Sequence, residues 1–131
     1  MIKYLVMATM VLVCGFAQAK KDDKVRKPAS VDRNVMVGGE TDMDACGGYG
    51  IVLATTTLIS FKSGQMAFDK VDINTNVSSC DSSEDGEYVG IVFGKKGQNC
   101  GVGTPVKTRQ EYKGPCKRGW IKKGFFELLA G

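Results

Sequence analysis

The sequence predicts an all-β fold built from five short strands in a single small domain. The chain has 131 residues, enough for one domain, and it contains 17 glycines but only 3 prolines. That glycine content is typical of many tight turns between short strands. Stretches rich in Val, Ile, Thr and Phe recur between turn-forming residues, and no stretch repeats its apolar residues with a helical period.

Each predicted strand is a short stretch rich in apolar or β-branched residues. The clearest is Glu87–Gly94, which follows the turn-rich sequence DSSEDG. A single turn is expected at Lys122–Phe125, and Phe126 and Leu128 alternate in the last strand, so both are expected to point inward. The five predicted barrel strands, in chain order, are Leu58–Lys62, Asn76–Cys80, Glu87–Gly94, Gly119–Ile121 and Phe126–Leu129, and a further predicted strand, Gly50–Ala54, precedes them.

Residues 1–19 have the pattern of a signal peptide for export. Lys3 precedes an apolar run from Tyr4 to Phe16, and Ala17-Gln18-Ala19 forms a small-residue cleavage site. The alternative of a transmembrane anchor is disfavoured because the run is shorter than the roughly 20 apolar residues needed to span a bilayer. Cys14 raises a lipoprotein alternative, which the bulky valine before it disfavours. We therefore expect a periplasmic or secreted protein with no stable membrane insertion after cleavage.

The mature chain divides into a charged lead-in and an ordered domain. Residues 20–44 are polar, mixed in charge and without apolar periodicity, which predicts a flexible segment that adds little to any core. Residues 45–131 form the predicted barrel domain. It holds the four cysteines that remain after cleavage, Cys46, Cys80, Cys100 and Cys116. An even number of widely spaced cysteines in a small exported chain predicts two disulfides rather than a zinc site, which needs closely paired ligands.

The composition argues against an enzyme. The chain has no histidine, so its serines and threonines lack a histidine base, and the cysteines are expected to be oxidised. Four acidic residues share one hydrophilic turn, where we expect all of them to be solvated and ionised, without catalysis and without a calcium site: Asp81, Glu84, Asp85 and Glu87. We expect no catalytic residue, no metal and no cofactor. The net charge of +4 is too small to indicate nucleic-acid binding.

Four motifs in the ordered part resemble those of bacterial Src-homology-3-like (SH3-like) domains. The strand sequences LISFKSGQ, EYVGIVFG and GWIKKGFFEL follow one another as in those domains, and the resemblance covers about residues 45–131. The closest likeness is to exported SH3-like proteins of the integron-cassette-associated type. Two positions depart from the SH3-like pattern, with Gln65 where proline is usual and Tyr88 where tryptophan is common. The matching motifs are Cys46–Gly50, Cys80–Asp81, Asn99–Val102 and Tyr112–Ile121.

The resemblance implies a five-stranded SH3-like barrel with an enlarged, disulfide-stapled loop between its third strand, Glu87–Gly94, and its fourth, Gly119–Ile121. It also implies a ligand groove walled by Trp120, Phe125 and Tyr88, with Tyr49 contributing. The other phenylalanines of the domain, Phe61, Phe68, Phe93 and Phe126, are expected in the core.

A basic patch near the predicted groove could bind an anionic partner, and a solvated loop surface is the slightly favoured alternative. The sequence predicts a non-catalytic binding module that recognises a peptide, a protein or a cell-wall component. The alternative is a secreted inhibitor or immunity-type protein that blocks one partner enzyme through the stapled loop. The basic patch consists of Lys113, Lys117, Arg118, Lys122 and Lys123.

The expected barrel limits how the cysteines can pair. Cys80 and Cys116 are expected at positions too distant for a disulfide, which excludes that pair and its complement. Of the two remaining patterns, we favour Cys46–Cys80 with Cys100–Cys116, because it closes the long loop on itself. The pattern Cys46–Cys116 with Cys80–Cys100 stays open, and it would require the loop to fold back across the sheet.

Overall fold

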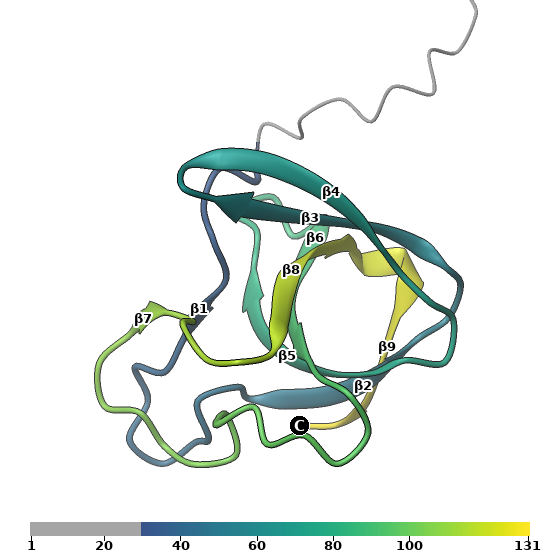
Figure 1. Ribbon diagram of the computed structural model, residues 1–131. Helices are drawn as coiled ribbons and strands as arrows, with labels where there is room; N and C mark the ends of the chain where they lie inside the picture. The colour runs from purple at the N-terminus through teal and green to yellow at the C-terminus, as the bar shows by residue number, and fades with distance from the viewer. Residues whose placement is uncertain (1–29) are drawn as a thin grey trace, which may run out of the picture.

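A computed structural model describes residues 30–131, which form an all-β domain (Figure 1). The all-β prediction is confirmed, and no α-helix occurs in the described range. The predicted count of five strands is wrong, because the main sheet alone has seven strands. The strands are β1 (Met36–Val37), β2 (Gly48–Val52), β3 (Thr56–Lys62), β4 (Gln65–Val71), β5 (Asn76–Ser82), β6 (Tyr88–Phe93), β7 (Gln110–Glu111), β8 (Lys117–Lys122) and β9 (Phe126–Ala130), with one 3₁₀ turn, η1 (Lys123–Phe125), before β9.

The main sheet is antiparallel, with the strand order β4-β3-β8-β6-β5-β2-β9. It curls around an interior, and its two edge strands, β4 and β9, are not paired with each other, so the sheet is open (Figure 1). The short strands β1 and β7 pair separately and lie beside it. β4 was missed in the sequence because its residues, QMAFDKV, show little alternation of polarity.

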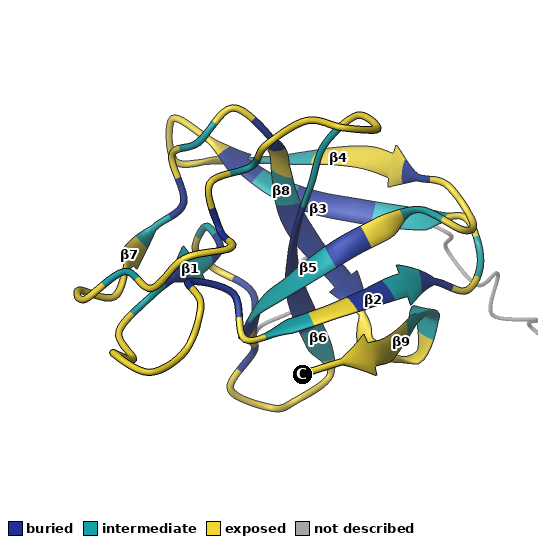
Figure 2. Ribbon diagram, turned by 90° about the horizontal axis from the view of Figure 1, so that it is seen from below, coloured by how far each residue is buried: buried dark blue, intermediate teal, exposed yellow. Residues whose placement is uncertain are grey.

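The central strands bury side chains on both of their faces. Adjacent residues such as Leu58 and Ile59, or Trp120 and Ile121, are each at most 2% exposed although they point to opposite sides. Figure 2 accordingly shows β3 and β8 largely as buried, whereas β9 is exposed. This double burial explains the nearly continuous apolar sequence of β6. The inner cluster consists of Val52, Leu58, Val71, Val77, Val89, Ile91 and Ile121.

The outer face of the sheet is covered by the N-terminal segment and by the long loop between β6 and β8. Val31 and Val35 are completely buried, and the peptide N–H of Tyr112 donates to the carbonyl of Val35 at 2.9 Å. The expectation that residues 20–44 add little to the core is therefore wrong for the part from Val31 onward. The predicted signal peptide and the first part of the lead-in lie outside the described residues. The outer cluster contains Val31, Val35, Val37, Ala45, Cys46, Ile59, Phe61, Val92, Val102, Tyr112, Cys116 and Trp120.

The phenylalanines follow the sequence expectation only in part. Phe61 is buried, and Phe93 and Phe126 pack against the inner cluster, as expected. Phe68 lies on edge strand β4 and is 49% exposed, and Leu128 on edge strand β9 is 57% exposed, so these two expectations are wrong. Gly50 makes the position of Phe126 possible, because a Cβ at this glycine would lie 2.3 Å from the Phe126 ring.

The two disulfides pair as favoured from the sequence, Cys46 with Cys80 and Cys100 with Cys116. The first joins the segment before β2 to β5, and its Cα atoms are 4.1 Å apart. The second closes the long loop, with 5.4 Å between its Cα atoms. Two disulfides in a small domain indicate an oxidising compartment. Within residues 30–131, no helix has the length and apolar character needed to cross a membrane.

The N-terminal segment should contribute measurably to stability. We expect Val35→Ala to lower the free energy of unfolding by about 2 kcal/mol, because it removes two buried methyl groups from the outer cluster. Thr41→Ala, at an exposed position of the same segment, is the matched control and should change it by less than about 0.5 kcal/mol. Urea denaturation followed by tryptophan fluorescence measures both, and equal stability of Val35→Ala and the unchanged protein would contradict the placement of this segment.

Candidate functional site

The four aromatic residues predicted to line one groove are not brought together. Trp120 is 1% exposed and belongs to the outer core, so a ligand cannot reach it while the N-terminal segment covers it. Tyr88 is half-buried at the start of β6, opposite Lys122, and Phe125 is half-buried in η1. Tyr49 lies on β2, opposite Ser78 of β5, and is 43% exposed. Only Tyr49 therefore keeps the exposed aromatic face that a binding role requires.

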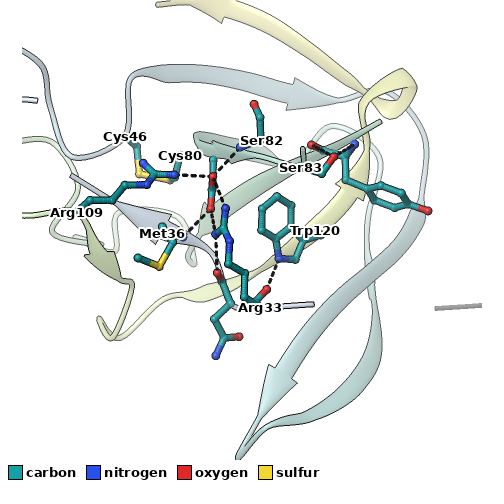
Figure 3. Close-up of polar contacts among 11 residues, drawn as sticks. Arg33, Met36, Cys46, Cys80, Ser82, Ser83, Arg109 and Trp120 are labelled. Carbon is teal, nitrogen blue, oxygen red and sulfur yellow. Dashed lines mark hydrogen bonds and ion pairs between the residues drawn. A yellow bond between two sulfur atoms is a disulfide. The ribbon is translucent and has the colours of Figure 1, made fainter. Parts of the chain in front are cut away.

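Trp120 is covered by a polar network centred on Asp81, whose side chain is 2% exposed. Arg33 donates to both carboxylate oxygens of Asp81, and Arg109 donates to one of them at 2.7 Å (Figure 3). The peptide N–H of Met36 donates to Asp81 at 3.0 Å. The Arg33 guanidinium also lies 5.4 Å from the centre of the Trp120 ring, and the indole N–H of Trp120 donates to the carbonyl of Arg33 at 2.8 Å. Asp81 thus holds the N-terminal segment over the tryptophan.

Asp81 is ionised in this environment. Burial alone would raise its pKa, but the hydrogen bond from Arg33, the peptide N–H groups of Met36 and Ser82 and the positive charge of Arg33 together hold the pKa of Asp81 below its ordinary value. The hydrogen bond to Asp81 in turn raises the pKa of Arg33. The expectation that every acid of the turn is solvated is therefore wrong for Asp81, which a bulge in β5 places on the outer face.

The rest of the acidic turn is exposed, as expected. Asp85 accepts hydrogen bonds from the peptide N–H of Glu87 and the hydroxyl of Ser83, and these hold the pKa of Asp85 below its ordinary value. Burial, followed by the charges of Asp85 and Glu87, raises the pKa of Tyr88. Among residues 30–131, no three Cys, Asp or Glu side chains converge into a cluster able to hold a metal ion.

The best candidate site is a pair of hollows that meet at Tyr49. One hollow, of about 640 Å³, lies between the outer face of β5 and the start of the long loop. The other, of about 510 Å³, lies between the same loop and the segment that leads into β2. Both volumes fall in the range of small-molecule sites, about 300–1,000 Å³. Tyr49, Ser78, Gln98 and Cys100 line both hollows, so they form the ridge between them.

The loop wall of this site is held in place by its own contacts. The peptide N–H of Lys95 donates to the side-chain oxygen of Gln98 at 3.0 Å, and the peptide N–H of Gln98 donates back to the carbonyl of Lys95 at 2.9 Å. A Cβ at Gly94 would lie 2.7 Å from the sulfur of Cys116, so only glycine lets the loop turn this close to the disulfide. The disulfide between Cys100 and Cys116 then fixes the far end of the wall.

The larger hollow is cationic and rich in hydrogen-bonding groups. Lys95 and Lys96 are exposed at its edge, and no acidic residue lines it. The other polar lining residues supply hydroxyl and amide groups, namely Thr75, Asn76, Ser78 and Gln98. An aromatic face beside such groups can stack on a sugar or peptide plane while the amides and lysines fix its polar atoms. The lining residues Thr75, Asn76, Ser78, Lys95, Lys96 and Gln98 were not predicted from the sequence. The glycine-rich stretch GKKGQNC, which ends in a cysteine, does indicate a constrained loop.

The predicted basic patch is split between the two ends of β8. Lys117 lies opposite Phe93 at one end, whereas Lys122 lies opposite Tyr88 at the other. Lys123 follows Lys122, and its peptide N–H donates to the carbonyl of Glu87, beside the acidic turn. Arg118 is half-buried, and Lys113 is exposed in the long loop. These five residues therefore do not form one continuous cationic surface.

Comparisons of the chain with protein-family models, with curated proteins and with solved structures find no match.

The Asp81 network predicts a pH-dependent loss of stability. Because the pKa of Asp81 is lowered in the folded protein, its contribution is present above the unfolded pKa, near 4, and is lost as the pH falls through the lower folded pKa. We expect Asp81→Asn to lower the free energy of unfolding at pH 7 by about 2 kcal/mol, a moderate value because both arginines are half exposed to water.

Urea denaturation of the variant and the unchanged protein between pH 7 and pH 2 checks this expectation. The difference in unfolding free energy should narrow at the acidic end, where Asp81 becomes protonated. Glu84→Gln, at an exposed acid of the same turn, is the control. A difference for Asp81→Asn that stays constant over the whole range would contradict an ionised Asp81.

Proposed function

We propose that this protein is an exported, non-catalytic binding module of SH3-like type that recognises a cell-envelope component or peptide through the ridge and hollows around Tyr49. The observation that carries the proposal is the 43% exposed Tyr49, set between two hollows whose shared wall is fixed by a disulfide. A wall that is rigid before binding loses little conformational freedom when a ligand is bound.

Several features support the exported, SH3-like part of this proposal. The signal-peptide pattern of residues 1–19 and the two disulfides fit an oxidising compartment outside the cytoplasm. The strongly curved antiparallel sheet, with a single 3₁₀ turn before its last strand, fits an SH3-like barrel that has been enlarged by two further strands and by the covering segments.

The non-catalytic part rests on the side chains that the site contains. Its residues offer amides, hydroxyls and lysines, and no hydroxyl that lines the two hollows is hydrogen-bonded to a carboxylate among the described residues. Such a lining can orient and hold a ligand, and it lacks the paired groups needed to break a bond.

Co-sedimentation of the exported protein with purified peptidoglycan tests the proposal. Tyr49→Ala should weaken retention about tenfold or more, because it removes the only large aromatic face that both hollows share. Leu53→Ala is the control, since Leu53 is similarly exposed, at 46%, but lines neither hollow. It should leave retention unchanged.

Failure of the unchanged protein to bind peptidoglycan or any envelope extract would refute the proposal. If it instead captured a single enzyme from the periplasm and blocked that enzyme, the inhibitor role would take its place. The same two variants would then show whether the inhibitory surface includes Tyr49.

A further inference from the structure

A second feature of the sheet is a split between β3 and β8. These neighbouring strands pair at a single position, Ile59 with Trp120. β3 is fully paired with β4 on its other side, and β8 is paired with β6 as far as Lys117. The halves Ser60–Lys62 and Lys117–Arg118 face each other across the split without forming pairs in the described chain. Two strand edges are therefore available inside the sheet.

The split contains a small cavity of about 290 Å³ with a positive lining. Lys62, Lys117 and Arg118 supply three cationic groups, and Asp69 is the one acid, 3.8 Å from the ammonium of Lys117. The cavity thus has an excess of positive charge and suits a single anionic group. Its apolar lining comes from Leu58, Phe61, Ala67 and the exposed Phe68.

Arg118 is held in place at this cavity and is incompletely bonded. Its guanidinium lies 6.0 Å from the centre of the Tyr112 ring, which packs against it. The hydroxyl of Tyr112 donates to the carbonyl of Cys100 at 2.8 Å and accepts from the peptide N–H of Cys116 at 3.2 Å, so the disulfide loop fixes the ring. The Nε of Arg118 is buried and has no hydrogen-bond partner among the described residues, which is unusual for a buried polar atom.

We propose that the split between β3 and β8 binds the C-terminal carboxylate of an extended peptide. A carboxylate matches the planar, forked donors of Arg118, and Lys62 and Lys117 complete the charge balance. The unpaired edges of the two strands supply peptide groups that an extended chain can pair with, as in strand addition to a sheet. Phe61 and Phe68 cover the apolar side of the last residue.

This site is separate from the hollows around Tyr49, because no residue lines both. The two proposals can therefore fail independently. Tyr49→Ala should leave carboxylate binding unchanged, and loss of peptidoglycan binding would not affect the split.

Titration of the ¹⁵N-labelled exported protein with the peptide acetyl-Gly-Ala-Phe bearing a free carboxylate tests the inference by NMR. We expect saturable shifts of the amide signals of Ser60–Lys62 and Lys117–Arg118. The same peptide with an amidated C-terminus should bind at least fivefold more weakly. Absence of saturable shifts at these amides, or equal binding of both peptides, would overturn the proposal.

Variants of the cationic groups give a second, independent measurement. Arg118→Gln should weaken binding of the free-carboxylate peptide at least fivefold. Lys117→Gln changes a side chain that is 66% exposed and should weaken binding about twofold or more. Lys122→Gln, at the other end of β8, is the matched control and should have no effect. Unchanged binding in Lys117→Gln together with unchanged binding in Arg118→Gln would also overturn the proposal. If Arg118→Gln fails to fold, unchanged binding in Lys117→Gln is by itself enough to overturn the proposal.

Discussion

The buried carboxylate of Asp81 is the interaction on which the arrangement of the domain depends. It is ionised at a position where its side chain is 2% exposed, and burial of an unpaired charge is very unfavourable. Its hydrogen-bond donors come from the N-terminal segment, from β5 itself and from the loop before β7: Arg33, Met36, Ser82 and Arg109. Segments distant in sequence must therefore meet at one point of the outer face for the charge to be compensated.

Gly90 shows how tightly this meeting point is packed. Gly90 is on β6, where it lies opposite Asp81 of β5 on one side and opposite Trp120 of β8 on the other. A Cβ at this position would lie 2.9 Å from the Cβ of Asp81 and 3.1 Å from a methyl group of Val35. Because Gly90 has no side chain, the carboxylate of Asp81 and the N-terminal segment can both pack directly against the sheet. The disulfide between Cys46 and Cys80 joins the end of the N-terminal segment, just before β2, to the residue that precedes Asp81 in β5.

Covering the outer face determines where a ligand can be bound. The segment that Asp81 holds in place buries Trp120, so the tryptophan stabilises the fold instead of contacting a ligand. The long loop completes the cover with Val102 and Tyr112, and its first residues are left to form the wall beside Tyr49. The same loop, through Tyr112 and Cys116, positions Arg118 at the split between β3 and β8. One structural device, the stapled loop, thus shapes both candidate sites.

The sequence by itself determined the all-β class and the approximate position of most strands, because β-branched runs and turn residues are local signals. It favoured the observed pairing of the cysteines but left one alternative open, because the pairing depends on how the strands are arranged in space. It could not reveal that residues 31–37 pack on the sheet. The few apolar residues there stand in a largely polar and charged stretch, and only the tertiary structure supplies the apolar face that buries them. For the same reason Asp81 was read as a solvated acid of a hydrophilic turn. Its partners Arg33 and Arg109 lie 48 and 28 residues away along the chain, and a contact over such separations exists only once the fold brings the segments together.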